Sequence, residues 1–244
     1  MKIDLRDVKC VYINLDSATQ NKKDMEEQCK ALEFKNYERL SARVVEPPTP
    51  EPPEHLMPAA GTWWNIYRGV AQSHIDILEN NDCPIIILED DSKVTDDWNP
   101  IIEVPDDTDG IYLGSSHSDG RYSAVDVGNN MAKITGVFST HAIMYLTEEY
   151  KQEVINIAKH LAYVENIATD MGWCKLQNHF NVLTPHKPFF YQADERESRN
   201  KWGDLTKAPL RITTRPGMVK PGDGHKGIKN SEFTGLSSKN VWEF

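Results

Sequence analysis

The sequence predicts an α/β fold in which a mostly parallel, mixed sheet is flanked by helices. Short apolar runs alternate with longer segments of helical periodicity through the first half of the chain. Strands that alternate with helices are joined by crossovers, which favours parallel pairing and helices on the sheet faces. At 244 residues, the chain is long enough to bury a substantial core within one domain.

The elements of the first half follow from apolar spacing and from turn residues. Ser17 is the expected N-cap of the first helix, in which Met25, Cys29 and Leu32 have helical spacing. A proline-rich stretch breaks the pattern and predicts an exposed, stiff loop. In order, we expect a strand at 7–15, a helix at 17–34, a strand at 37–45, the proline loop at 47–58, a helix at 62–81 and a strand at 84–88.

The second half has the same alternation, followed by a segment of weaker pattern. We expect a strand at 109–116, a loop at 118–130, a strand at 133–146, a helix at 147–161 that begins at Thr147, a short helix at 168–179 and an extended segment at 180–192. Residues 1–200 are the expected domain. Residues 201–244 are the expected basic C-terminal extension, which completes or covers the site.

The charge of the chain is distributed unevenly. The formal net charge is −10, and residues 201–244 hold six Lys and two Arg against two Asp and two Glu, which is +4. Residues 1–200 therefore carry −10 − 4 = −14. An acidic body is a poor general surface for nucleic acid. The basic extension either serves a phosphate-bearing ligand or is a solvated surface segment.

The spacing of the cysteines and the length of the apolar runs give an expectation for the cellular location of the protein. Four cysteines stand far apart without a CxxC pair, which argues against a zinc site and against a disulfide scaffold. The N-terminus shows no cleavage site of a signal peptide, and no apolar run approaches the length of a membrane helix. We therefore expect a cytoplasmic protein without a transmembrane segment.

Three consecutive acids end the strongest apolar strand. Glu89, Asp90 and Asp91 follow PIIIL, and ligands of open α/β sheets bind beyond the carboxyl ends of strands. Such oxygens suit Mg²⁺ or Mn²⁺, which take one or two carboxylates and share the rest of their shell with phosphates. The alternative is an acidic turn. No glycine-rich phosphate loop is present, so the metal and basic side chains would hold the phosphates of a nucleotide.

Six segments in order resemble glycosyltransferase family 25, the family of bacterial lipooligosaccharide galactosyltransferases and collagen galactosyltransferases. The most specific is the Leu-Glu-Asp-Asp segment, and the likeness extends over residues 10–198. The segments are VYINLDSATQNKKDM with YERLSARV, GVAQSHIDILE, PIIILEDDSKV, IYLGSS, TGVFSTHAIMYLT and VLTPHKPFFYQADERES.

This resemblance implies a GT-A-type, Rossmann-like fold and a metal-dependent, inverting transfer of a hexose. The donor would be a UDP-sugar of galactose or glucose, and the acceptor a hydroxyl of a glycan or lipooligosaccharide. Asp91 is the first expected ligand of Mn²⁺ or Mg²⁺, with Asp90 or Glu89 sharing or orienting the ion. Asp170 matches the position of the family's acid and is the expected catalytic base, and an N-cap is its alternative role.

Further residues are candidates for donor binding. Asn14 and Asp16 end the first strand, where base and ribose lie in this fold, and Ser73 and His74 match the family's Ser-His pair. Gly114, Ser115 and Ser116 end another strand and are expected to line the sugar pocket. Thr140 and His141 lie in the next matching segment. For each group an ordinary structural role is the alternative: a loop hydrogen bond, a half-buried histidine, or a turn.

The extension and the tryptophans supply the last candidates. His225 is a candidate metal ligand, and Lys226 and Lys229 are candidates for the diphosphate, because neighbouring glycines let a ligand approach the backbone. A basic surface loop is the alternative. Trp63, Trp64 and Trp98 would either stack on a sugar or belong to the core.

Two other functions remain open at this stage. Sugar transfer to hydroxylated bases of DNA would use the basic extension, and the −14 body argues against it. A glycosyltransferase-like binding module without catalysis is the other possibility.

Overall fold

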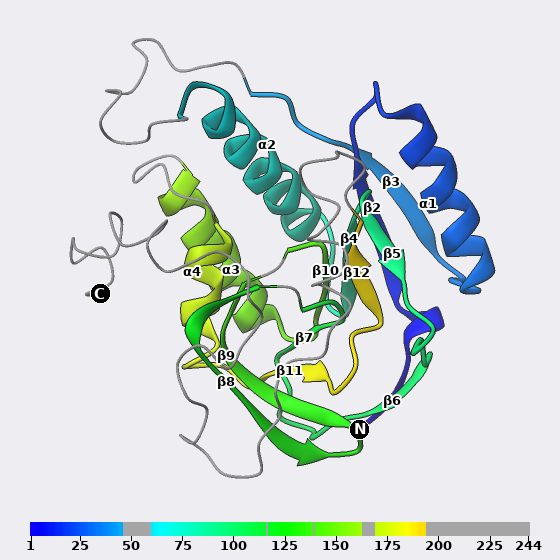
Figure 1. Ribbon diagram of the computed structural model, residues 1–244, viewed down its shortest axis with the longest axis vertical. Helices are drawn as coiled ribbons and strands as arrows, with labels where there is room; N and C mark the ends of the chain where they lie inside the picture. Colours follow the sequence, from blue (N-terminus) through cyan, green and yellow to red (C-terminus); the bar gives the residue numbers. More distant parts are fainter. Residues whose placement is uncertain (46–59, 116, 139, 163–168, 194–244) are drawn as a thin grey trace.

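The chain folds into one large mixed sheet with helices on both faces (Figure 1). The computed structural model describes residues 1–45, 60–115, 117–138, 140–162 and 169–193, without the side chains of 60–66 and 117–122. The proline-rich stretch at 47–58 and the extension at 201–244 lie outside the described residues. The predicted α/β class is confirmed.

Eight strands form the large sheet in the order β3-β2-β4-β10-β7-β11-β9-β8. Strand β2 is parallel to β3 and β4, and β11 is parallel to β7, whereas β10 and β9 are antiparallel to both of their neighbours. Eight strands less these two leave six that share one direction, so the sheet is mostly parallel as expected. The bounds are β2 (Lys9–Asn14), β3 (Tyr37–Ser41), β4 (Ile85–Glu89), β7 (Gly110–Tyr112), β8 (His117–Gly128), β9 (Met131–Phe138), β10 (Ala142–Tyr145) and β11 (Val182–Pro185).

The helices divide between the two faces of the sheet. Helix α1 (Thr19–Ala31) lies on one side, and α2 (Ala60–Glu79), α3 (Glu148–His160) and α4 (Asp170–Leu176) lie on the other (Figure 1). Thr147 caps α3 as predicted, because its hydroxyl accepts from the Tyr150 amide at 3.4 Å. The prediction for Ser17 is wrong: the N-cap of α1 is Ala18, without a side-chain bond.

Two apolar cores result from the alternation of side chains along the central strands. Successive residues of a strand point to opposite faces. On β2 and β4, one set of side chains packs toward α2, α3 and α4, and the intervening set packs toward α1. The first set is Val11, Ile13, Ile85 and Ile87, and the second is Cys10, Tyr12, Ile86 and Leu88. A strand buried on both faces explains the continuous apolar run of β4.

Two predictions for the second half need correction. Of the expected loop at 118–130, residues 118–128 belong to β8, which pairs with β9, and only 129–130 form a turn. The expected single strand at 133–146 is two strands, because β9 pairs with β11 whereas β10 inserts between β4 and β7.

Four short strands extend the architecture beyond the main sheet. Strand β1 (Lys2–Asp4) pairs with β6 (Ile101–Glu103), and β5 (Ser92–Val94) pairs with β12 (Phe190–Gln192). A 3₁₀ helix at Leu5–Asp7 follows β1. All four cysteines are free. Among the described residues, no helix has both the length and the apolar character needed to cross a bilayer.

Candidate functional site

The acidic triplet lies at the carboxyl end of a central strand, as the sequence predicts. Strand β4 runs between β2 and β10, and residues 85–88 are fully buried. Glu89 is its last residue, and Asp90 and Asp91 form the turn that leads into β5. The Glu89 amide donates to the His141 carbonyl at 2.8 Å, which fixes the strand end against the segment before β10.

The three carboxylates point toward three different partners. Glu89 lies 3.2 Å from His74 of α2. Asp90 accepts from the Asn14 amide at 2.7 Å, and Asp91 accepts from Gln192 of β12 at 2.9 Å. Each carboxylate is therefore held by a different element, α2, β2 or β12. Within the described residues, no three His, Cys, Asp or Glu side chains converge in the manner of a metal cage.

Glu89 and His74 form a buried pair. The His74 side chain has no exposed surface, and that of Glu89 is 17% exposed. Burial opposes the charge of Glu89, but the hydrogen bond and charge of His74, together with Thr140, outweigh it and lower the pKa of Glu89. The His74 ring packs edge-on against Trp173, with centroids 5.2 Å apart. His74 therefore holds Glu89 in its ionised form.

Asp91 has one oxygen bonded and one oxygen without a partner. Oδ2 accepts from Gln192, whereas Oδ1 is buried and has no hydrogen-bond partner among the described residues. Burial, followed by the charge of Glu89, raises the pKa of Asp91 to about 8. A buried carboxylate oxygen of this kind is a ready ligand for a cation or a hydrogen-bond donor.

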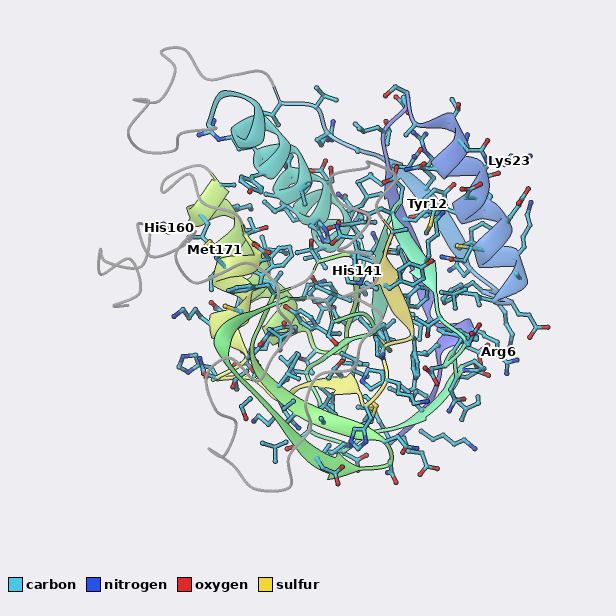
Figure 2. The ribbon with its side chains drawn as sticks, in the orientation of Figure 1. Arg6, Tyr12, Lys23, His141, His160 and Met171 are labelled. Carbon is cyan, nitrogen blue, oxygen red and sulfur yellow. The ribbon has the colours of Figure 1, made fainter. Side chains whose placement is uncertain are left out.

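His141 lies in the middle of the molecule, between the helices of the two faces (Figure 2). Its Nε2 atom is buried and has no partner in the described part of the chain. Burial lowers the pKa of His141 to about 4, against the opposing effect of Glu89. A Cβ atom at Gly114 would overlap Nε2 and lie 2.8 Å from the Phe190 carbonyl oxygen. Glycine at 114 therefore makes room for the imidazole.

Asp170 of α4 and Tyr145 of β10 are two further buried polar residues whose pKa values the charge of Glu89 affects. Asp170 is the first residue of α4, and the N-cap is Thr169, so the capping alternative for Asp170 does not hold. Burial, with a smaller contribution from Glu89, raises the pKa of Asp170 to about 6. Burial, Tyr112 and then Glu89 raise the pKa of Tyr145.

These groups form what we call the Glu89 cluster: Glu89, His74, Asp91, His141, Tyr145 and Asp170. All five buried side-chain atoms that have no hydrogen-bond partner among the described residues belong to it, namely His74 Nδ1, Asp91 Oδ1, His141 Nε2, Tyr145 Oη and Asp170 Oδ1. Each of these residues also interacts electrostatically with Glu89. His74, Asp91 and His141 lie at the carboxyl end of β4, whereas Tyr145 pairs with Ile85 at the other end of this strand. Since buried polar groups are normally bonded, the three unpartnered atoms at the strand end are candidates for contact with a ligand.

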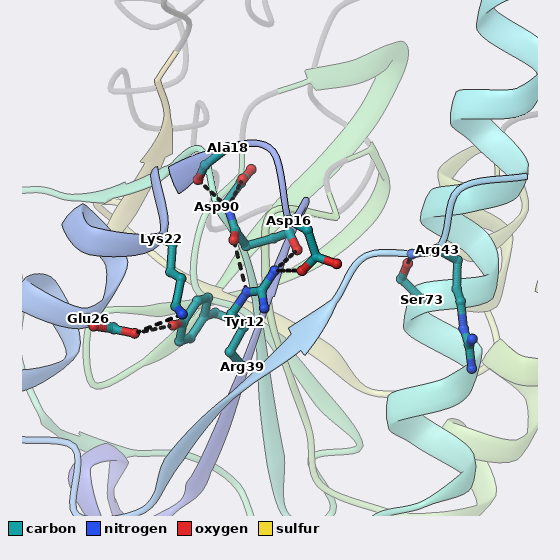
Figure 3. A network of polar contacts seen from close by, with 10 residues as sticks. Tyr12, Asp16, Ala18, Lys22, Glu26, Arg39, Arg43, Ser73 and Asp90 are labelled. Atoms are coloured by element: carbon teal, nitrogen blue, oxygen red, sulfur yellow. Dashed lines mark hydrogen bonds and ion pairs between the residues drawn. The ribbon is translucent and has the colours of Figure 1, made fainter. Parts of the chain in front are cut away.

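A second polar network lies beside the cluster, at the ends of β2 and β3 (Figure 3). Asn14 is buried, and its Nδ2 donates to Asp90 and, at 3.0 Å, to the Ala18 carbonyl. Arg39 Nε donates to Asn14 Oδ1 at 2.9 Å, and Arg39 also pairs with the exposed Asp16. We call Asn14, Asp16, Arg39 and Asp90 the Asn14 network. Both the nitrogen and the oxygen of the Asn14 side-chain amide form hydrogen bonds within the protein.

The remaining strand-end and helix candidates have internal partners. The Ser73 hydroxyl donates to the Gly69 carbonyl at 2.7 Å and accepts from the Arg43 amide at 2.9 Å, which ties α2 to the segment after β3. Ser115 is buried beside Thr184, whose hydroxyl is 3.5 Å away. Trp98 is half-buried and packs against three phenylalanine rings at the edge of the second core, which favours the core alternative.

Several candidates lie outside the described residues. They are Ser116, His225, Lys226 and Lys229, together with the side chains of Trp63 and Trp64.

Three residues of the site were not predicted from the sequence. Arg39 is the middle residue of β3, where it pairs with Tyr12, and its side chain reaches Asn14 two residues further along β2. Gln192 reaches Asp91 because β12 pairs with β5, a contact between distant segments. Tyr145 lies at the end of an apolar strand. Of the three, only Arg39 has a sequence feature that could have identified it. It is a positively charged residue in a strand whose neighbours along the sequence end in acidic residues.

Comparison with known proteins gives no family assignment. No protein-family model and no curated protein matches this chain. Among solved structures, a nucleoside-diphosphate-sugar pyrophosphorylase from Vibrio cholerae RC9 is 13% identical over 74% of this chain and 73% of its own, with a TM-score of 0.37. A CTP:phosphocholine cytidylyltransferase from Streptococcus pneumoniae is 9% identical over 82% of this chain and 99% of its own, also with a TM-score of 0.37. Likenesses this distant say nothing about chemistry.

Proposed function

We propose that the chain is a metal-dependent inverting glycosyltransferase that moves a hexose from a UDP-sugar to a hydroxyl of a glycan or lipooligosaccharide. The observation that carries this proposal is the Glu89 cluster, in which unpartnered buried atoms of His74, Asp91 and His141 lie at the carboxyl end of a central strand. The family 25 resemblance supplies the reaction class, and its most specific segment contains Glu89, Asp90 and Asp91.

The residues present fit a divalent cation that is shared with a ligand. A cation with three or more protein carboxylates does not fit, since no such group converges in the described residues. Mg²⁺ and Mn²⁺ in nucleotide sites take one or two carboxylates and complete their shell with phosphate oxygens. Asp91 Oδ1 is an open donor for such an ion, with Asp90 beside it. When bound, the ion would neutralise the diphosphate leaving group.

Asp170 is the group we assign as general base. A carboxylate of raised pKa is a better proton acceptor, and a pKa of about 6 lies near neutral pH. In the proposed step, Asp170 takes the proton of the acceptor hydroxyl while that oxygen bonds to the anomeric carbon. The attack comes from the face opposite the diphosphate. The bond between this carbon and the diphosphate oxygen breaks, and UDP leaves with the electron pair.

The other cluster residues position these two carboxylates. His74 keeps Glu89 ionised, and the charge of Glu89 acts on both Asp91 and Asp170. Gln192 holds one oxygen of Asp91 and leaves the other toward the ligand. Asn14 orients Asp90 and thereby couples the strand end of β2 to the metal-binding turn.

Calorimetric titration with UDP and other nucleoside diphosphates, with and without Mn²⁺, tests the proposal. We expect tight UDP binding only with the metal. Asp91→Asn preserves shape and removes the charge, so it should nearly abolish this binding, by about a hundredfold or more. Asp7→Asn is the matched control, because Asp7 lies in the 3₁₀ helix and pairs with Lys35.

The outcomes separate the alternatives. If UDP binds and UDP-sugars are hydrolysed slowly without an acceptor, glycosyl transfer is supported. Donor binding that survives in Asp91→Asn would show that the metal assignment is wrong. If no nucleotide binds under either condition, a non-catalytic module is favoured over the transferase.

A further inference from the structure

Strand β5 begins directly after the acidic turn, so the position of β5 sets that of the turn. Only Asp90 and Asp91 separate β4 from β5. One edge of β5 pairs with β12, and next to this pairing the Ala193 amide donates to the Asp91 carbonyl at 2.7 Å. Backbone groups of an extended chain alternate between its two edges. The Ser92 carbonyl and the Val94 amide therefore point away from β12.

A glutamine of α1 bonds to both of these backbone groups. Gln28 Nε2 donates to the Ser92 carbonyl at 3.0 Å, and Gln28 Oε1 accepts from the Val94 amide at 2.9 Å. A carboxamide offers a donor and an acceptor side by side, as the backbone of a neighbouring strand does. Gln28 therefore takes the place of a strand partner on the edge of β5 that β12 does not cover.

Helix α1 is itself anchored in the core and contacts β5 a second time. Met25 and Cys29 have no exposed surface and belong to the core on the α1 side of the sheet. One turn before Gln28, Asp24 pairs with Lys93 of β5 at 3.3 Å. Residues four apart lie on the same side of a helix. Two successive turns of α1 thus hold β5 from the same side.

The bonds of Gln28 act on the proposed metal ligand through β5. In the register of β5 and β12, Ser92 lies opposite Gln192, and the side-chain amide of Gln192 donates to Asp91 Oδ2 at 2.9 Å. The other oxygen, Asp91 Oδ1, is buried and has no hydrogen-bond partner in the part of the chain that the structure describes. A shift of β5 would change the contact with Gln192 and would redirect both oxygens of the carboxylate.

We propose that Gln28 is a positioning residue, which holds the metal-binding turn in place by fixing β5 against α1. This inference rests on the proposed function, because it takes Asp91 as a ligand of the metal. Gln28 bonds to the backbone of β5 and acts on Asp91 through that strand. Groups that orient a metal ligand are commonly needed for full metal affinity.

A second glutamine with the same kind of contact supplies a matched control. Gln177, the C-cap of α4, accepts from the Val137 amide at 2.9 Å and donates to the Val137 carbonyl at 2.7 Å. Gln177 is fully buried, whereas Gln28 is half-buried, so the loss of Gln177 should destabilise the fold at least as much. Helices α1 and α4 lie on opposite faces of the sheet (Figure 1), so the two substitutions act on different regions.

The test compares Gln28→Met and Gln177→Met with wild type, because methionine is unbranched like glutamine and can form neither bond. The measurements are NMR of the Gln192 side-chain amide without metal, calorimetric titration with UDP and Mn²⁺, and urea unfolding. In Gln28→Met, we expect the Gln192 signal to shift and the UDP affinity to fall about tenfold. In Gln177→Met, the signal and the affinity should remain as in wild type, although the urea midpoint falls.

The outcomes separate this inference from the proposed function. If wild type binds UDP with Mn²⁺, undiminished affinity in Gln28→Met would overturn the inference, and so would an equal loss of affinity in both variants. An unchanged Gln192 signal in Gln28→Met would overturn it as well. If wild type binds no UDP, the proposed function fails, and a Gln192 signal that responds only to Gln28→Met would still support the positioning of the turn.

Discussion

The Asn14 network and the Glu89 cluster lie at the carboxyl ends of adjacent strands, yet they differ in hydrogen bonding. In the network, Asn14 is 1% exposed and its amide bonds to Asp90, Ala18 and Arg39. In the cluster, five buried atoms have no partner in the described residues. This difference in hydrogen bonding is the reason why we propose the cluster, rather than Asn14 itself, as the group that contacts a ligand.

The unpartnered atoms of the Glu89 cluster should lower the stability of the fold. A buried donor or acceptor without a partner destabilises a fold by about 1–3 kcal/mol. The cluster concentrates such groups around one ionised glutamate, so the raised pKa values of Asp91 and Asp170 have a common origin in burial and the charge of Glu89. We therefore expect substitutions in the Glu89 cluster to lower activity and to raise stability. Substitutions in the Asn14 network should lower stability.

The largest expected effect is on turnover when the proposed base is removed. Asp170→Asn should lower kcat for transfer by about 10²–10⁴, the usual contribution of a general base. Donor binding should persist, because Asp170 is not among the proposed metal ligands. Steady-state kinetics alongside UDP titration checks both statements. Wild-type turnover in this variant would remove Asp170 from the mechanism.

A smaller effect, mainly on stability, is expected in the Asn14 network. Asn14→Ala leaves Asp90 and Arg39 without their shared amide, so it should lower the free energy of unfolding by about 2–3 kcal/mol. Asp16→Asn is the matched control, because Asp16 is 76% exposed and its ion pair with Arg39 should contribute less than about 1 kcal/mol. Urea unfolding of both variants is the measurement. Equal losses would show that the network is not the structural region.

Much of the fold could be predicted because its signals are local. The β4 run PIIIL and the cap at Thr147 carry their structure in neighbouring residues. Strand β8 could not be predicted in this way. Its Ser, Asp and Gly content is typical of a loop, and it becomes a strand through pairing with β9. The separation of β9 from β10 also depends on distant partners.

The residues of the candidate site differ in the same way: some have a local sequence signal, whereas others depend on contacts between distant segments. Glu89 and Asp91 became candidates because they end or follow an apolar strand, and Asp170 because it matches the position of the acid in glycosyltransferase family 25. The bond from Gln192 to Asp91 spans 101 positions, and no local pattern reports it. The committed internal bonds of Ser73 and Asn14 were equally invisible, since they depend on how α2 and β3 pack.

The most direct test of the central claim compares the stability of wild-type protein and Asp170→Asn as a function of pH. The folded-state pKa of Asp170 is raised from 3.8 to about 6, so the folded state is favoured below the lower value and loses this contribution as pH rises through the higher one. Near neutral pH, Asp170→Asn should be more stable than wild type by about 1–3 kcal/mol. The difference should vanish below about pH 4. A variant no more stable than wild type near neutral pH would contradict the claim that the Glu89 cluster is held at a cost in stability.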